Sequence, residues 1–181
     1  MKRAIIVHGW DGHPQECWFP WLKAELEKEG FKVFVPQMPA PEAPNMDRWV
    51  PRLSNAVGEP DTETYLVGHS AGCITILRYL EGLPLGRKIR KAVLVAGFTD
   101  SLGYKELENF FKKPVDWRRA KTHCLDFVAI HSDNDPYVKL CHAGVLKEKL
   151  SAKIIIEHGK GHMGGEDNIR DLPSVLQAIK S

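Results

Sequence analysis

The chain has 181 residues, of which 43% are apolar and 27% are charged, and its formal net charge is +2. This length and apolar content predict one globular domain over residues 1–181 with one ordinary core. The nearly balanced charge provides no overall field that would recruit nucleic acid or a membrane surface, so neither is an expected partner.

Six short apolar runs alternate with longer amphipathic or polar stretches. Continuous apolar runs are typical of strands that are buried on both faces, as in parallel sheets. The predicted strands are residues 4–7, 32–35, 64–67, 91–96, 126–131 and 153–157. The predicted helices lie near residues 19–29, 46–57, 73–81, 104–111, 140–150 and 168–180. This alternation predicts an α/β fold in which a six-stranded parallel sheet is flanked by helices.

The first predicted strand runs into the turn His8-Gly9-Trp10. The apolar part of this strand is too short for a signal-peptide core or a membrane span, so a cytoplasmic protein is expected. The four cysteines agree with this expectation, because they are widely spaced, form no zinc-type pattern and suit free thiols in a reducing compartment.

Two long connections follow the second and the fourth predicted strands. Residues 36–44 contain four prolines and predict a stiff, extended surface loop. This loop follows the carboxyl end of a strand, where open α/β sheets bind ligands. Residues 97–122 form the longest connection, and we predict that they contain a short helix and a rim of the active site, with Trp117 in that rim.

Residues 68–72 have the sequence Gly-His-Ser-Ala-Gly and lie between a predicted strand and a predicted helix. In a G-x-S-x-G elbow the serine occupies a strained turn, and the glycines avoid clashes with the neighbouring strand and helix. The turn raises the Ser70 hydroxyl above the edge of the sheet, next to the N–H groups of a helix N-terminus. The elbow therefore predicts Ser70 as a nucleophile.

A nucleophilic serine needs a base within hydrogen-bond reach and a third group that orients the base. Enzymes with this elbow place the three groups in the chain order serine, acid, histidine. His162 follows the last predicted strand in the glycine-rich segment 159–165, which lets its ring reach across the edge of the sheet, so we predict that it is the base. Cys73, near the start of the helix after Ser70, is an alternative nucleophile.

The acid is predicted in the loop after the fifth strand, which contains Asp133, Asp135 and Pro136. Pro136 restricts the backbone of Asp135 and favours it as the carboxylate that orients His162. Asp133 suits the cap of a turn, although it is also an alternative acid. Asp100, after the fourth predicted strand, is a further alternative.

An oxyanion hole needs two backbone N–H groups that point at the developing negative charge. The N–H of Ala71 directly follows the nucleophile, and Gly9 allows the N–H of Trp10 to turn toward the same space. The side chains of Trp10 and Trp117 are predicted to line an apolar substrate pocket. The segment 159–165 lacks the spacing of a phosphate-binding loop, and neither a cofactor nor a metal is predicted.

Taken in chain order, these features resemble the small α/β-hydrolase serine esterases of the retinoblastoma-binding protein 9 and YdeN type. The shared features are His8-Gly9-Trp10, the elbow at residues 68–72, the acid loop at residues 132–136 and Gly161-His162. The resemblance implies the sheet order 2-1-3-4-5-6 and no separate lid domain. It also implies that Ser70, Asp135 and His162 form the triad of an enzyme that hydrolyses a small ester or amide. The chain has no L-x-C-x-E motif, so the retinoblastoma protein is not an expected partner.

Three functions are compatible with these residues. The first is a serine hydrolase that works through an acyl-enzyme, and the second is acyl transfer to an acceptor other than water, which the sequence does not distinguish from hydrolysis. The third is a binding or scaffold protein that keeps the fold around a silent site. All three triad residue types lie at compatible positions, which favours the enzyme. The sequence predicts neither the natural substrate nor the oligomeric state.

Overall fold

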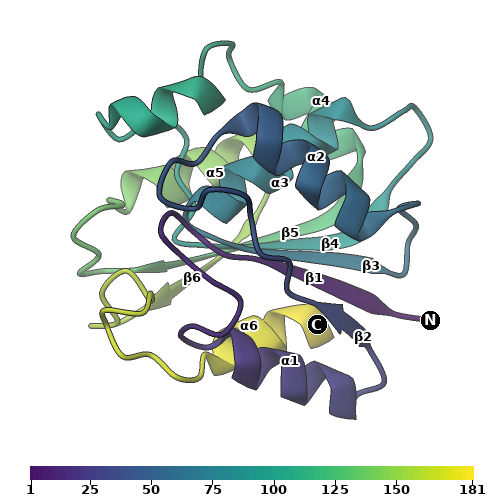
Figure 1. The fold of residues 1–181 in the computed structure, drawn as a ribbon, viewed down its shortest axis with the longest axis horizontal. Helices are drawn as coiled ribbons and strands as arrows, with labels where there is room; N and C mark the ends of the chain where they lie inside the picture. Colours follow the sequence, from purple (N-terminus) through teal and green to yellow (C-terminus); the bar gives the residue numbers. More distant parts are fainter.

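A computed structural model describes all 181 residues of the chain. At its centre is a parallel six-stranded sheet with the order β2-β1-β3-β4-β5-β6 (Figure 1). The strands are β1 (Arg3–Val7), β2 (Lys32–Phe34), β3 (Thr64–His69), β4 (Ile89–Val95), β5 (Cys124–Ser132) and β6 (Lys153–Glu157). The predicted α/β fold and the sheet order implied by the resemblance are confirmed.

Helices cover both faces of the sheet. They are α1 (Phe19–Lys28), α2 (Met46–Val57), α3 (Ala71–Gly82), α4 (Trp117–Thr122), α5 (Cys141–Leu150) and α6 (Pro173–Lys180), together with the 3₁₀ helix η1 (Lys105–Phe110). In Figure 1, α2, α3, α4 and α5 lie on one face, and α1 and α6 lie on the other. No helix combines the length and the apolar character that crossing a bilayer requires.

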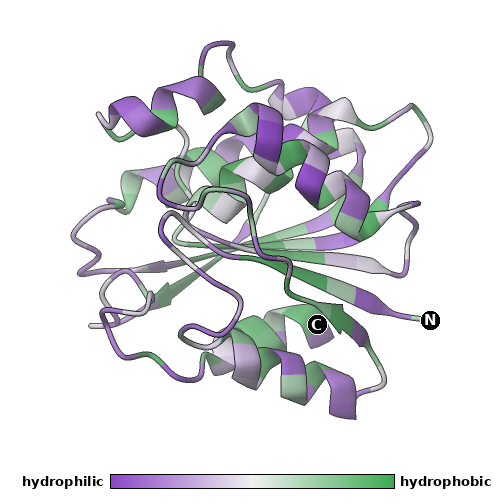
Figure 2. Cartoon of the chain, in the orientation of Figure 1, coloured by the Kyte–Doolittle hydropathy of each residue, from purple (hydrophilic) through white to green (hydrophobic).

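The core forms two layers, one on each face of the sheet. Side chains alternate along each strand, so Ile5 and Leu66 pack toward the α2–α5 face while Ile6 and Val67 pack toward α1 and α6. Figure 2 shows the hydrophobic residues concentrated in the strands, with hydrophilic residues on the outer parts of the helices. Burial on both faces explains why the strand segments are continuously apolar in the sequence.

Two predicted helices differ from the observed ones. The last helix begins at Pro173, five residues later than predicted, because Asn168 has a left-handed backbone (φ 55°) and Pro173 suits a first helical turn. The predicted helix at residues 104–111 is the shorter 3₁₀ helix η1. Residues 97–122 contain a second short helix, α4, which returns the chain to the start of β5. No lid domain interrupts the sheet and its helices.

Because all strands are parallel, the loops after their carboxyl ends gather at one edge of the sheet. The loop after β2, at residues 36–44, is anchored there, since the Trp49 indole N–H donates to the Pro39 carbonyl oxygen at 2.9 Å. The Trp10 indole N–H donates to the Glu42 carbonyl oxygen of the same loop at 3.0 Å. The candidate site lies at this edge.

Candidate active site

Ser70 is the single residue between β3 and α3. Its backbone has φ 53° and ψ −118°, a strained conformation for a residue with a side chain. The Ser70 N–H donates to the Val95 carbonyl oxygen and the Ser70 carbonyl oxygen accepts from the Cys73 N–H, both at 2.9 Å. These bonds to β4 and α3 hold the strained turn in place, as the G-x-S-x-G pattern predicts.

Close contacts require the two glycines of the elbow. A Cβ atom on Gly72 would lie 2.2 Å from the Val7 carbonyl oxygen, because α3 begins directly against β1. A Cβ atom on Gly68 would lie 2.8 Å from the backbone nitrogen of Cys73. Both contacts are with backbone, so no side-chain movement can relieve them.

We expect Gly72→Ala to lower the free energy of unfolding by about 3 kcal/mol, because the added methyl group forces α3 away from β1. Gly82→Ala is the matched control, since a Cβ atom at the end of the same helix meets no atom within 4 Å. Urea denaturation of both variants measures the difference. Equal stability of the two variants would show that the elbow tolerates a side chain at position 72.

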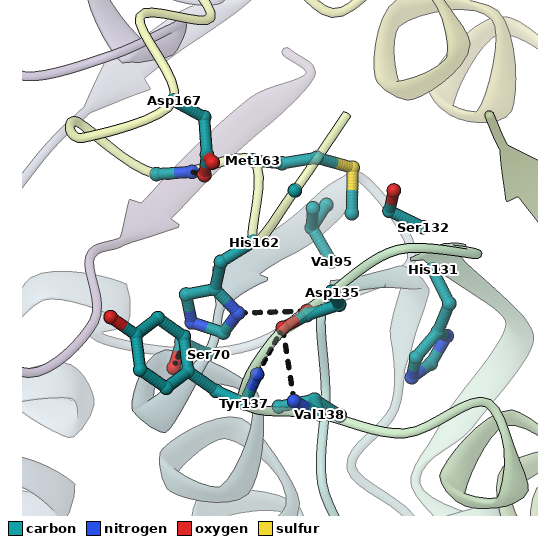
Figure 3. Close-up of polar contacts among 12 residues, drawn as sticks. Ser70, Val95, His131, Ser132, Asp135, Tyr137, Val138, His162, Met163 and Asp167 are labelled. Carbon is teal, nitrogen blue, oxygen red and sulfur yellow. Dashed lines mark hydrogen bonds and ion pairs between the residues drawn. The ribbon is translucent and has the colours of Figure 1, made fainter. Parts of the chain in front are cut away.

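The structure brings Ser70, His162 and Asp135 together in one chain of hydrogen bonds. His162 Nε2 lies 3.0 Å from Ser70 Oγ, and His162 Nδ1 lies 2.8 Å from Asp135 Oδ2. Figure 3 shows the His162 ring between the Asp135 carboxylate and Ser70. An ionised carboxylate only accepts, so Nδ1 carries the proton and Nε2 is free to accept the Ser70 hydroxyl proton. This arrangement can deprotonate the hydroxyl during an attack.

The Asp135 carboxylate is almost inaccessible, with 1% of its side chain exposed. Its Oδ1 accepts from the N–H groups of Tyr137 at 2.8 Å and Val138 at 3.0 Å (Figure 3). Burial by itself raises the pKa of Asp135, but the hydrogen bonds from His162, Val138 and Tyr137 outweigh burial and hold the pKa below its ordinary value. Asp135 is therefore ionised at neutral pH and faces the imidazole.

The two alternative acids lie elsewhere. Asp133 accepts from the Gly159 N–H at 2.9 Å and contacts His158 Nδ1 at 2.6 Å, so it ties the loop after β5 to the loop after β6. Asp100 is exposed and accepts from the Leu102 N–H at 2.8 Å. Neither carboxylate hydrogen-bonds to His162.

His69 contributes to the site in a way that the sequence did not reveal. Its Nε2–H donates to the His162 carbonyl oxygen at 2.9 Å, which fixes the loop that carries the base. Burial lowers the pKa of His69 to about 3, with His162 adding to the effect, so the ring stays neutral and keeps this bond at neutral pH. The two histidines are 93 positions apart, and no local pattern connects them.

The turn after β1 lies directly against the nucleophile. A Cβ atom on Gly9 would be 3.0 Å from Ser70 Cβ. His8 fixes this turn, because its Nδ1–H donates to the Gly9 carbonyl oxygen at 2.8 Å and its Nε2 accepts from the Met38 N–H at 2.9 Å. The backbone N–H of Trp10 makes no hydrogen bond within the protein, and the backbone N–H of Ala71 belongs to the first turn of α3, where donors lack helical partners.

Ser70 and His162 open into a cleft of about 530 Å³. Its apolar and aromatic walls are Trp10, Phe98, Leu102, Tyr104, Leu107, Pro136 and Tyr137. Four acidic residues, Asp11, Glu16, Glu166 and Asp167, are also among the lining residues. No lysine or arginine is among the lining residues, so the cleft has a negative charge.

Trp117 does not reach this cleft, which corrects the prediction that it lines the pocket. It begins α4 and packs against the hydrophobic core on the α2–α5 face. Arg78 determines where the chain before Trp117 runs. Its guanidinium donates to the carbonyl oxygens of Phe110 and Lys113 and so holds η1 and the following loop against α3. The part of the connection that forms the rim therefore precedes Trp117.

Cys73 is not placed to act as a nucleophile. Only 1% of the residue is exposed, and its Sγ–H donates to the carbonyl oxygens of Gly68 and Val95. Burial raises the pKa of the Cys73 thiol well above its ordinary value, so the thiolate is not formed. No group of three His, Cys, Asp or Glu side chains is arranged to hold a metal ion.

The chain is similar to known hydrolases in sequence and in structure. The family model described as serine hydrolase matches residues 4–181. YdeN of Bacillus subtilis (strain 168) is 31% identical over 182 residues, which cover 99% of this chain and 95% of YdeN. The crystal structure of the B. subtilis ydeN gene product superposes with a TM-score of 0.94 at 30% identity, covering 99% of this chain and 97% of that one.

A mammalian protein matches more distantly. Serine hydrolase RBBP9 of Rattus norvegicus is 27% identical over 165 residues, which cover 88% of this chain and 86% of RBBP9. The family model and the YdeN match extend over nearly the whole chain.

Proposed function

This chain belongs to the serine hydrolase family, and we propose that it hydrolyses a small carboxylic ester or amide through an acyl-enzyme on Ser70. One observation carries the proposal, namely the unbroken hydrogen-bond chain from Asp135 through His162 to Ser70 at the base of a cleft. In this role Ser70 is the nucleophile, His162 the general base and Asp135 the group that orients the imidazole.

Acylation begins when Ser70 Oγ attacks the substrate carbonyl carbon and its proton passes to His162 Nε2. The carbonyl oxygen becomes an oxyanion, which the N–H groups of Trp10 and Ala71 stabilise in our proposal. Asp135 stays ionised and stabilises the imidazolium that forms. His162 then donates its proton to the leaving alcohol or amine, the carbonyl–heteroatom bond breaks, and the acyl group remains on Ser70.

Deacylation repeats these steps with water. His162 Nε2 removes a proton from a water molecule, the resulting hydroxide equivalent attacks the acyl carbon, and the carbon–Oγ bond breaks with return of the proton to Ser70. The product acid leaves through the cleft. Esters are the preferred class in this proposal, since resonance with nitrogen makes an amide carbonyl carbon less electrophilic than an ester carbonyl carbon. The cleft volume of about 530 Å³ suits a small substrate.

The charge of the cleft predicts a substrate preference. The carboxylates of Asp11, Glu16, Glu166 and Asp167 attract a cationic group and repel an anionic one. We expect kcat/KM for acetylcholine to exceed that for its neutral isostere, 3,3-dimethylbutyl acetate, by about tenfold at low ionic strength, with the ratio falling as salt is added. Equal values for the two esters would show that the carboxylates do not influence binding.

A fluorophosphonate probe tests the proposed function. We expect the probe to label the native chain covalently and to leave the Ser70→Ala variant unlabelled, because the probe reacts with activated serines. A folded native chain that stays unlabelled would instead support a silent binding protein. Adding an alcohol acceptor to the assay distinguishes hydrolysis from acyl transfer, because only transfer yields a new ester.

A further inference from the structure

β6 is an edge strand of the sheet and pairs with β5 on one side only (Figure 1). Its five residues read Lys-Ile-Ile-Ile-Glu, with a positive charge at position 153, a negative charge at position 157 and isoleucine between them. Ile156 is 36% exposed, and Ile154 and Ile155 are half-buried. The opposite edge strand, β2, has only three residues.

The backbone of β6 shows which groups face outward. The Asp133 N–H donates to the Glu157 carbonyl oxygen at 3.1 Å, so Glu157 directs its backbone groups toward β5. Successive residues of a strand direct these groups to opposite sides, so Ile155 also faces β5 while Ile154 and Ile156 face away from it. The N–H and C=O groups of Ile154 and Ile156 are therefore free to pair with another strand.

We propose that β6 pairs antiparallel with β6 of a second copy of this chain, around a two-fold axis at Ile155. In this register Ile154 lies opposite Ile156 of the second copy, and each such pair exchanges two backbone hydrogen bonds. Lys153 lies opposite Glu157 of the second copy in a pair without backbone hydrogen bonds, where side chains approach most closely. The two six-stranded sheets then form one continuous sheet.

The charges of β6 support a second copy of this chain as its partner. Neither Lys153 nor Glu157 forms an ion pair within the chain. In the antiparallel dimer each meets its opposite charge, at both ends of the strand pair, and an isologous interface needs this self-complementarity. A parallel arrangement would instead place like charges side by side. The short strands bury less surface than a standard interface, so we expect a weak, concentration-dependent dimer.

Charge reversal provides the test, with sedimentation velocity over a series of protein concentrations as the measurement. In the Lys153→Glu variant, the glutamate at position 153 of each copy lies opposite Glu157 of the other copy, so both ends of the strand pair carry two negative charges. Glu157→Lys places two positive charges opposite each other at the same two ends. We expect each single variant to raise the dimer dissociation constant by about tenfold or more. An equimolar mixture of the two variants is expected to form heterodimers, because every cross-strand pair is again of opposite charge.

The double variant Lys153→Glu/Glu157→Lys restores both pairs and is expected to dimerise like the native chain. Circular dichroism checks that the variants are folded, and this proposal does not depend on the proposed function. A native chain that stays monomeric at every concentration would overturn the proposal. So would single variants that dimerise as strongly as the native chain, or variants that do not associate when mixed.

Discussion

Replacing Ser70 with alanine is expected to lower kcat for p-nitrophenyl acetate by about 10⁴- to 10⁶-fold. The change removes the only hydroxyl that hydrogen-bonds to His162, so no acyl-enzyme can form. The backbone N–H groups of Trp10 and Ala71 remain, so a small residual rate above that in water is expected from the cleft alone. Stopped-flow or steady-state absorbance of p-nitrophenol measures the effect.

Ser54→Ala is the matched control for this change. Ser54 is an exposed residue of α2, and the same chemical substitution there leaves the cleft untouched. We expect its kcat to equal that of the native chain. If Ser70→Ala kept a native kcat while folded, the hydroxyl of Ser70 would not be the nucleophile.

The second large effect is expected at Asp135. In Asp135→Asn the amide can donate to His162 Nδ1, which favours the tautomer whose Nε2 carries the proton and cannot accept from Ser70. We expect kcat for p-nitrophenyl acetate to fall by about 10⁴-fold. The depressed pKa of Asp135 adds to this expectation, because it shows that the native site is built around the ionised carboxylate.

Asp133→Asn separates the role of Asp135 from a general effect of charge in the same loop. Asp133 lies two residues earlier and contacts the exposed His158 rather than His162. We expect this variant to keep kcat within about threefold of the native value, because surface pairs of this kind contribute little. An equal loss of kcat in the two variants would contradict the assignment of Asp135 as the group that orients His162.

Local patterns in the sequence predicted the framework of the molecule well. β3 is buried along its whole length, and its apolar run together with the adjacent G-x-S-x-G motif located the strand, the turn and the helix. The order of strands was available only through the resemblance, since hydrophobic periodicity does not say which strands are neighbours. The positions of Asp135 and His162 after consecutive strands were sufficient to expect both at the edge that carries Ser70.

Features that depend on contacts between distant segments were not predictable. The bond from His69 to the His162 carbonyl oxygen joins the end of β3 to the loop after β6, two segments that share no motif. Trp117 was expected at the rim because its segment follows a strand, yet the anchoring of Phe110 by Arg78 places an earlier part of that segment there. The last helix was predicted too long, because residues 168–172 precede it as a turn at Asn168 followed by irregular chain.

The negative charge of the cleft also arises from distant segments. Asp11 and Glu16 follow β1, whereas Glu166 and Asp167 follow β6, and each pair alone resembles an ordinary solvated loop. Only the folding of both loops around Ser70 brings the four carboxylates to one cavity.

In the proposed reaction the Ser70 oxygen carries the acyl group during turnover. Rapid acid quench of the enzyme during p-nitrophenyl acetate hydrolysis, followed by peptide mass spectrometry, tests it directly. We expect an added acetyl group on the peptide that contains Ser70, formed at the rate of p-nitrophenol release. Full turnover with the acetyl group on another residue, or with no acetylated peptide at all, would contradict it.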